Sequence, residues 1–222
     1  MKKGEIEKEI KVLNINPSIL EERIIVLGGQ EIQNGLTHMW WYDIGHLPEK
    51  LPPCAINNPK DCGRVLSVAT TLGMDTKESF RDRKIYFRVR QEDVGCDLTL
   101  KYKIGVERNV ISNSEISYEL KEGELQNIKS CLLQSGFECI AIHEKRRQSF
   151  LLVLSGQEIR IDIDEWPGIP PYVEIEAHDV NLITKAVHEL GLSEREVSTA
   201  IGQEFFLSHG IDFFSNRTFE SA

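Results

Sequence analysis

Apolar and polar residues alternate along much of this chain, which is the pattern of β-strands with one buried face. The first such stretch runs from Glu5 to Leu13 and places charged side chains on one face. Similar patterns predict strands at 30–44, 84–90, 97–104, 110–118, 137–147, 148–154, 157–164 and 172–177. A hairpin signal at Ser155-Gly156 joins two of them, so we expect antiparallel pairing.

Helical spacing of apolar residues predicts further elements between and after these strands. Asn16 and Pro17 are suited to open a helix that Gly28 ends. Helices are also predicted at 122–134, 181–190 and 194–207, so that residues 178–222 form a helical C-terminal part. The proline-rich segment 45–80 is too long for a hairpin loop, and we expect an irregular insertion or lid with a short helix at 64–72.

Charge and composition restrict the classes of partner. The 222 residues carry 26 Lys+Arg and 35 Asp+Glu, a net charge of −9, which disfavours nucleic acid and anionic membranes as partners. No secretory signal or run of about 18 apolar residues occurs, so we expect a cytoplasmic protein. Five cysteines without a Cys-x-x-Cys pair predict reduced thiols and no zinc site.

Charged residues recur at every second position on six predicted strands, and each pair has one sign. The acidic pairs are Glu7/Glu9, Asp162/Asp164 and Glu174/Glu176, and the basic pairs are Arg88/Arg90, Lys101/Lys103 and Lys145/Arg147. A solvated sheet face explains one such strand, but like charges on one face repel unless opposite charge lies between them. We therefore predict an α+β protein whose sheet closes into a β-barrel-like tunnel with a charged lumen and helices packed outside.

Such a lumen has a definite chemistry. Clustered carboxylates without His or Cys suit a hard cation, Mg²⁺ or Mn²⁺. Paired Arg and Lys side chains suit phosphate oxygens. Metal and bases around one site are what polyphosphate transfer requires, because that reaction depends mainly on positioning and charge neutralisation.

These residues resemble, in order, the motifs of the CYTH superfamily, the triphosphate tunnel enzymes that include class IV adenylyl cyclases and thiamine triphosphatases. The segment 7–11 (Glu-Lys-Glu-Ile-Lys) resembles the opening Glu-x-Glu-x-Lys signature. The later matches are Phe87-Arg88-Val89-Arg90, Leu98-Thr99-Leu100-Lys101, Glu144-Lys145-Arg146-Arg147, Ile161-Asp162-Ile163-Asp164 and Val173-Glu174-Ile175-Glu176. One motif alone is weak, but the ordered set from 7 to about 177 is specific.

The resemblance implies a single CYTH-like domain over 1–222, built on an eight-stranded antiparallel tunnel that holds Mg²⁺ or Mn²⁺. By position, the implied metal ligands are Glu7, Glu9, Asp162, Asp164, Glu174 and Glu176. The implied triphosphate-binding residues are Lys11, Arg88, Arg90, Lys101, Lys145 and Arg147, and the implied catalytic residues are Glu9, Lys11, Asp162 and Glu176.

Two positions depart from the family pattern. Where the family often has Arg-x-Glu, this chain reads Asn113-Ser114-Glu115, so one phosphate contact is missing or comes from Arg108. Lys103 lies on the same predicted face as Lys101 but has no family counterpart, so it is not assigned to the site.

The leading function is metal-dependent hydrolysis of a small-molecule triphosphate: inorganic tripolyphosphate, thiamine triphosphate or a nucleoside triphosphate. Adenylyl cyclisation of ATP is the alternative, and a non-catalytic polyphosphate or nucleotide sensor is the third, although both Glu-x-Glu strands are intact. The run 145–150 resembles cyclases, whereas the spacing between the pairs Asp162/Asp164 and Glu174/Glu176 resembles thiamine triphosphatase. Hydrolysis is favoured because it needs only triphosphate and metal.

A homodimer is left open, and Trp40, Trp41 and Tyr42 either stack on a substrate ring or belong to the core.

Overall fold

The computed structural model describes residues 2–43, 85–93 and 95–220. The predicted insertion at 45–80, with its helix at 64–72, lies outside these residues. The strands are β1 (Lys2–Val12), β2 (Gln30–Tyr42), β3 (Ile85–Glu92), β4 (Gly95–Glu107), β5 (Val110–Leu120), β6 (Cys139–Leu154), β7 (Gln157–Trp166), β8 (Ile169–Ala177) and β9 (Val197–Ser198). The helices are α1 (Pro17–Val26), α3 (Glu124–Gln134), α4 (Val180–Glu189) and α5 (Gly202–Ser208), with a 3₁₀ turn at Glu194–Glu196.

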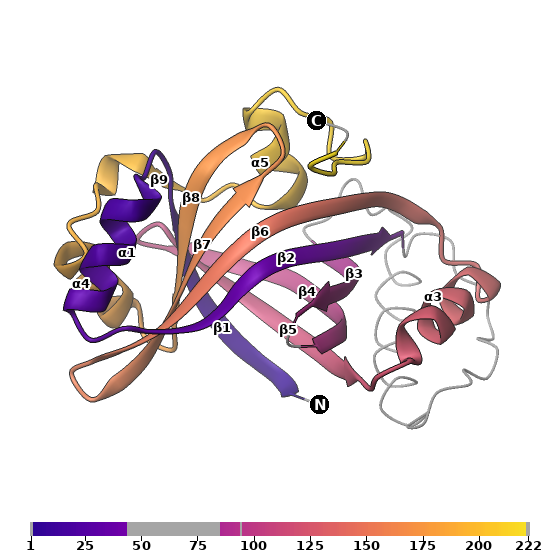
Figure 1. Cartoon of the computed structure of the whole chain (residues 1–222), viewed down its shortest axis with the longest axis horizontal. Coiled ribbons are helices and arrows are strands. Elements are labelled where there is room, and N and C mark those ends of the chain that lie inside the picture. Colours follow the sequence, from indigo (N-terminus) through magenta and orange to yellow (C-terminus); the bar gives the residue numbers. More distant parts are fainter. Residues whose placement is uncertain (1, 44–84, 94, 221–222) are drawn as a thin grey trace.

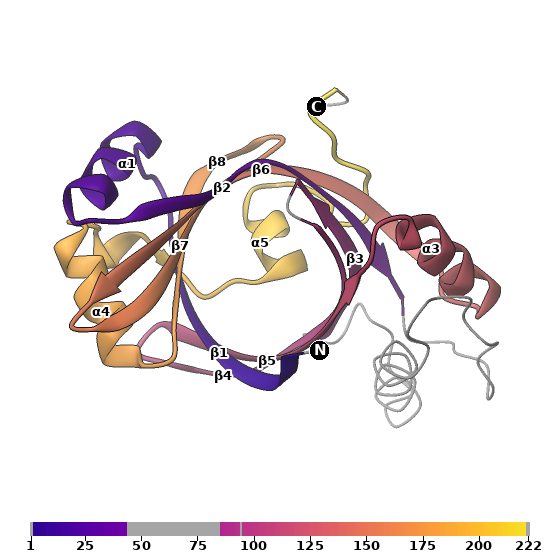
Figure 2. The same cartoon turned by 60° about the horizontal axis from the view of Figure 1, so that its bottom comes forward.

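The strands β1 to β8 form a closed antiparallel barrel (Figures 1 and 2). Their order around the ring is β5-β4-β3-β2-β6-β7-β8-β1, and β1 pairs again with β5 to close it. The short strand β9 adds a second pairing to the end of β1. Closure removes the free edges that an open sheet would expose and confirms the predicted α+β tunnel.

Much of the apolar core lies outside the barrel, between the strands and the helices, although Phe205 and Phe206 of the same core also line the cavity at the α5 end. Alternation places Phe87, Val89 and Leu98 on the outer face, where Ile128 and Leu132 of α3 join the same cluster. On the other side of the barrel, α1 and α4 cover the outer faces of β1, β7 and β8 with a second cluster: Leu20, Ile24, Ile183 and Ala186 against Ile161, Val173 and Ile175. Burying the outer faces in this way leaves the lumen to polar side chains, as the charge pattern predicted.

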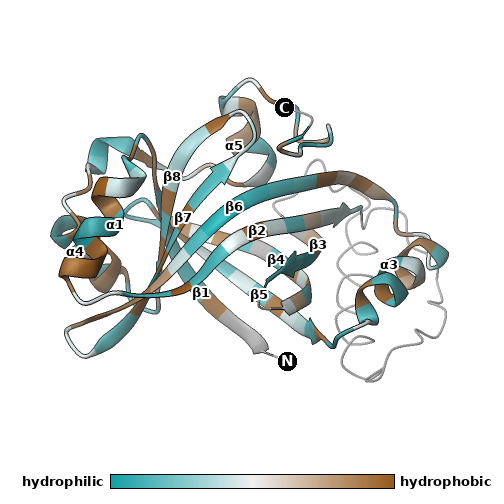
Figure 3. Ribbon diagram, viewed as in Figure 1, coloured by the Kyte–Doolittle hydropathy of each residue, from teal (hydrophilic) through white to brown (hydrophobic). Residues whose placement is uncertain are grey.

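Strand β6 differs from the sequence prediction. Residues 137–154 were expected to form two strands, but β6 runs unbroken from Cys139 to Leu154. Its polar middle, between more apolar ends, is visible in Figure 3. The change in hydropathy marks a change in what the strand faces rather than a turn, because β6 pairs with β2 over 139–151 and with β7 over 146–154, so both pairings continue across the expected break.

The C-terminal part is also less helical than predicted. The helix expected at 194–207 is wrong: the chain makes the 3₁₀ turn, then β9, and only then α5. Val197 and Ser198 pair with Val12 and Lys11 of β1, and the ladder hydrogen bonds of that pairing are incompatible with a continuous helix. As a result, α5 starts at Gly202 and lies across one end of the barrel (Figure 2).

Aromatic rings fix this end of the molecule. Phe206 stacks on His143 of β6 and meets Trp166 of β7 edge to face, while Phe213 packs on Trp41 of β2. The buried His143 ring nitrogen Nε2 bonds the carbonyl oxygens of Phe213 and Ser215. Burial lowers the pKa of His143 to about 4, so this ring is neutral at ordinary pH.

The cysteines are only partly in the reduced state that composition predicts. Cys131 of α3 is disulfide-bonded, so the expectation of reduced thiols is wrong at this position, whereas Cys96 and Cys139 are free. Sequence spacing alone does not reveal which cysteines meet in space. None of the helices within the described ranges is both long and apolar enough to cross a bilayer.

Candidate active site in the barrel lumen

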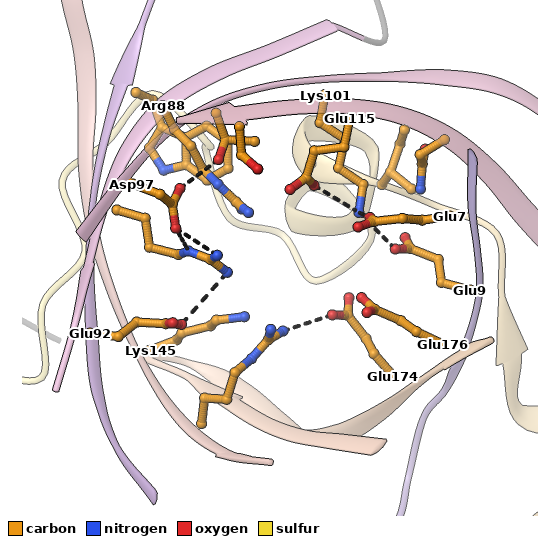
Figure 4. A pocket seen from close by; sticks show the side chains of 18 of the residues that line it. Glu7, Glu9, Arg88, Glu92, Asp97, Lys101, Glu115, Lys145, Glu174 and Glu176 are labelled. Atoms are coloured by element: carbon orange, nitrogen blue, oxygen red, sulfur yellow. Dashed lines mark hydrogen bonds and ion pairs between the residues drawn. The ribbon is translucent and has the colours of Figure 1, made fainter. Parts of the chain in front are cut away.

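The barrel encloses a cavity of about 600 Å³ lined largely by charged and polar side chains (Figure 4). Ten of the residues predicted from the sequence line it: Glu7, Glu9, Lys11, Arg88, Arg90, Lys101, Lys145, Arg147, Glu174 and Glu176. Asp162 and Asp164 lie behind this lining and are 0% exposed. The structure therefore brings all twelve predicted residues to one lumen, ten at its surface and two beneath it.

The carboxylates of β1 and β8 gather on one side of the lumen, although Lys101 lies among them and Glu92 and Asp97 lie on the opposite side (Figure 4). Glu174 and Glu176 of β8 and Glu7 and Glu9 of β1 lie together on one side, because these strands are neighbours. The labelled bases Arg88 and Lys145 lie across the cavity from them (Figure 4). An enclosed site with carboxylates facing cations can hold a divalent metal against one side of a polyanion.

Three carboxylates from β7 and β8 converge tightly. Oxygens of Asp162, Glu174 and Glu176 lie within 4.8 Å of one another. Burial, together with the negative charge of Asp162, raises the pKa of Glu176 to about 8. Crowded carboxylate oxygens with no nitrogen or sulfur ligand suit Mg²⁺ or Mn²⁺, so this donor set fits the cation expected from the sequence.

Lys101 of β4 is held among three further carboxylates. Its Nζ lies 2.9 Å from Glu9, 3.2 Å from Glu7 and 3.8 Å from Glu115. Burial alone would lower the pKa of Lys101, but Glu9 and Glu7 outweigh it and raise the pKa well above its usual value. Lys101 is therefore a fixed positive charge that offsets the acids of β1.

Arg147 of β6 organises the buried acids. Its guanidinium contacts Asp162 at 2.6 Å, both oxygens of Asp164 at 2.6 and 2.7 Å, and Glu174 at 2.8 Å. The pKa of Glu174 lies well below its usual value, because Lys11 and Arg147 outweigh the effect of burial. Lys11 and Arg147 thus hold Glu174 ionised at the cavity surface.

Lys145, two residues earlier on β6, is a lumen lysine whose pKa is lowered rather than raised. Burial and the nearby charge of Arg147 lower its pKa to about 8, even though Asp164 lies 2.8 Å from its Nζ. Its ammonium also faces the ring of Trp166 at 5.6 Å from the centroid. An added anion in the cavity would stabilise the charged form of Lys145.

The two arginines of β3 are bound differently. Arg90 donates to Asp97 at 2.7 and 2.8 Å and approaches Glu92 at 3.6 Å, so its charge is offset within the protein. Arg88 lies over the ring of Trp41, at 5.5 Å from the centroid, and its buried Nε has no hydrogen-bond partner in the described part of the chain. Arg88 is thus the arginine best placed to receive an external anion.

Lys11 of β1 joins the acidic side to the aromatic end of the cavity. Its Nζ lies 3.0 Å from Glu174 and faces the rings of Tyr172 and Phe205 at 5.4 and 5.2 Å from their centroids. Glu174 and Glu9 raise the pKa of Lys11 against the effect of burial. Lys11 therefore stays charged where α5 closes the barrel.

Several lining residues were not predicted. Glu92, Asp97, Asn113, Glu115 and Arg160 all line the cavity. Glu92, Asp97 and Arg160 share the parity of a predicted residue two or four positions away, so following the inward face along those strands would have found them. No site residue was predicted on β5, which carries Asn113 and Glu115. Asp97, Glu115 and Arg160 contact Arg90, Lys101 and Asp162, respectively, so the lumen offsets much of its own charge.

Other residues singled out from the sequence lie elsewhere. Lys103 donates to the carbonyl oxygen of Thr199 at 3.0 Å, and Arg108 contacts Asn181 at 3.4 Å on the exposed surface. Arg108 does not line the cavity formed by the described residues, so it does not replace the absent family arginine there. Of the aromatic cluster, Tyr42 is buried in the core and Lys129 covers the ring of Trp40 at 3.8 Å, whereas Trp41 belongs to the core and also lines the cavity.

A family model described as the CYTH domain matches residues 74–200, more than half of the chain. The chain belongs to the CYTH family. The matched segment begins after β1 and therefore does not include Glu7, Glu9 and Lys11. These residues lie in the same lumen because β1 pairs with β8.

Solved structures share this CYTH fold at low sequence identity. A candidate adenylate cyclase from Vibrio parahaemolyticus is 16% identical, with a TM-score of 0.59 over 93% of this chain and 99% of its own. The PH1012 protein of Pyrococcus horikoshii is 15% identical, with a TM-score of 0.56 over 88% and 96%. An adenylyl cyclase candidate from Hippeastrum, described as having a dominant triphosphatase activity, is 16% identical, with a TM-score of 0.53 over 93% and 96%. No curated protein matches the sequence.

Proposed function

We propose that this CYTH protein hydrolyses a triphosphate in the lumen with the help of Mg²⁺ or Mn²⁺. The observation that carries the proposal is that one lumen cavity of about 600 Å³ gathers the carboxylates of β1 and β8 opposite the bases Arg88 and Lys145. A triphosphate is a short polyanion, and its transfer chemistry needs bases on its oxygens and a cation at the reacting group. The lumen residues provide the first and can hold the second.

The acidic side would hold the cation. Asp162, Glu174 and Glu176 form the tightest group of oxygens, and Glu7 and Glu9 lie beside them on β1. Bound there, the metal would polarise a phosphoryl oxygen and promote attack by water. Lys11 and Arg147 keep Glu174 charged, and Glu176 must lose its proton before it can bind a cation. Asp164, whose oxygens contact Lys145 and Arg147, would position these two bases.

The basic side would bind the phosphate oxygens. Arg88 has an unused buried donor, and Lys145 carries a destabilised positive charge that an anion would favour. Arg90, Lys101, Lys11 and Arg147 are ion-paired with carboxylates in the lumen, so a triphosphate would have to share or replace those partners. Substrate binding is therefore expected to rearrange charge pairs rather than to fill an empty positive pocket.

Cyclisation of ATP is the second candidate, since the Vibrio relative is a candidate adenylate cyclase. The Hippeastrum protein favours hydrolysis instead, because its described dominant activity is that of a triphosphatase. Hydrolysis asks less of the site: triphosphate, metal and water suffice. Cyclisation also needs a nucleoside pocket that orients the ribose hydroxyl.

A product assay separates these functions. Inorganic tripolyphosphate, thiamine triphosphate and ATP would each be incubated with the protein and Mg²⁺ or Mn²⁺, and free phosphate would be measured separately from cyclic AMP and pyrophosphate. We expect free phosphate as the main product, and its loss in EDTA. Cyclic AMP as the main product of ATP would establish the cyclase instead, and binding without any product would indicate a sensor.

A further inference from the structure

A side-chain donor in the lumen has no acceptor. Nδ2 of Asn113 on β5 is buried and makes no hydrogen bond within the described part of the chain. Asn113 is 1% exposed and lines the cavity. Buried amide groups in native proteins are nearly always satisfied, so an unpaired donor in a residue that lines a cavity points to a ligand of that cavity as its partner.

The position of Asn113 places this donor beside the acids of β1. Asn113 pairs in register with Glu7 across the β1–β5 closure of the barrel. Residues directly opposite on antiparallel strands put their side chains on the same face, about 5 Å apart at Cβ. The amide therefore lies at the edge of the acidic side, close to where the metal-bound end of a triphosphate would sit.

The amide differs from its neighbours in having no charge. Lys101 is held by Glu7 and Glu9, and Lys11 is held by Glu174. A cation at position 113 would face the same carboxylates and be drawn into an ion pair with them. A neutral amide is attracted much less strongly, so its N–H groups remain available to a ligand oxygen.

We propose that Asn113 is a triphosphate-binding residue, which donates from Nδ2 to a non-bridging phosphate oxygen on the acidic side of the lumen. The proposal rests on the proposed function, since it takes the ligand of the cavity to be a triphosphate. Asn113 and Arg88 then form a matched pair of unpaired donors, on β5 and β3, that meet the anion from different parts of the ring. Asn113 supplies direction without charge, and Arg88 supplies both.

The test compares affinity with stability in two variants. Asn113→Leu removes the donor at nearly constant shape. Asn113→Asp replaces the amide with a carboxylate, which has the same sign of charge as the triphosphate. Binding of imidotriphosphate, a tripolyphosphate analogue with nitrogen bridges that resists hydrolysis, would be measured by calorimetry in Mg²⁺, and thermal unfolding would be measured without ligand. Asn34→Asp, at an exposed asparagine of β2 outside the cavity, is the control.

We expect Asn113→Leu to bind the analogue about tenfold more weakly, because a hydrogen bond to a charged acceptor is lost. Asn113→Asp should bind it more weakly still, because its carboxylate also repels the phosphate. The unliganded Asn113→Leu protein should be as stable as wild type or more stable, since the donor has no partner to lose. Wild-type affinity in both variants would overturn the proposal, as would a loss of stability that parallels the loss of affinity. If wild type itself does not bind the analogue, the proposed function fails and this assignment falls with it.

Discussion

At the scale of single residues, the lumen is defined by which charges are paired with one another. The sequence predicted the charged residues because they alternate with apolar ones, but it did not predict their partners. Lys101 was expected to bind phosphate, and the structure places it against Glu7, Glu9 and Glu115. Such partners come from different strands, and strand register, which a local pattern does not contain, decides them.

Replacing Lys101 tests how much these ion pairs matter. In Lys101→Met, Glu7 and Glu9 lose their shared cation, and we expect the free energy of unfolding in EDTA to fall by about 2 kcal/mol. Added Mn²⁺ should recover part of the loss, since a cation then offsets the same carboxylates. Urea unfolding measures both effects, with Lys185→Met on the exposed surface of α4 as the control. Equal stability of Lys101→Met and wild type in EDTA would contradict the role given to Lys101.

Glu176 makes the stability of the metal-free protein depend on pH. Its pKa is about 8 in the folded protein, against 4.5 for an ordinary glutamate. Between these values the folded state holds a proton that the unfolded state has released, so stability falls as the pH rises toward 8. Glu176→Gln should remove this part of the pH dependence.

The measurement is the free energy of unfolding in EDTA at pH 6 and pH 8.5, compared between variant and wild type. Glu107→Gln, at an exposed position of β4, should keep the wild-type dependence. An identical slope in Glu176→Gln and wild type would show that Glu176 is already ionised at neutral pH.

At the scale of elements, the sequence predicted strands better than it predicted their ends and joins. The alternating stretches all became strands, because two-residue periodicity directly reports one buried face. The break expected inside β6 was wrong, since its charged middle faces the lumen and its apolar ends face helices. The helix expected over 194–207 failed because β9 pairs with β1, a tertiary contact that outweighs local helical spacing.

The segment around α5 is predicted to be a structural part of the barrel and not a loose tail. Phe206 is 2% exposed and packs against His143, Trp166 and Phe213. Phe206→Ala should lower the free energy of unfolding by about 3–4 kcal/mol through lost burial and the cavity left behind. Its neighbour Leu207 is 57% exposed, so Leu207→Ala should change stability by less than about 1 kcal/mol.

Chemical denaturation of both variants checks this prediction. Similar small losses in the two proteins would mean that α5 does not close the barrel end in solution.

At the scale of the whole molecule, the barrel inverts the usual placement of apolar and polar residues. The apolar clusters lie under the outer helices, and the charged groups face inward around the cavity. This arrangement explains why a net charge of −9 says little about the ligand: the bases that would meet an anion are enclosed and separate from the outer surface. The tunnel could be predicted because charge parity recurs strand after strand. The single-domain organisation over 1–222 and a homodimer remain predictions.

The central claim is that the lumen binds a divalent cation and a triphosphate together and hydrolyses the triphosphate. The most direct measurement is the rate of phosphate release from tripolyphosphate in Mg²⁺, Mn²⁺ and EDTA, for wild type, Glu176→Gln and the control Glu107→Gln. We predict metal-dependent release in wild type and in the control, and at least a hundredfold lower rate in a folded Glu176→Gln. Release that persists in EDTA, or at the wild-type rate in Glu176→Gln, would contradict the claim.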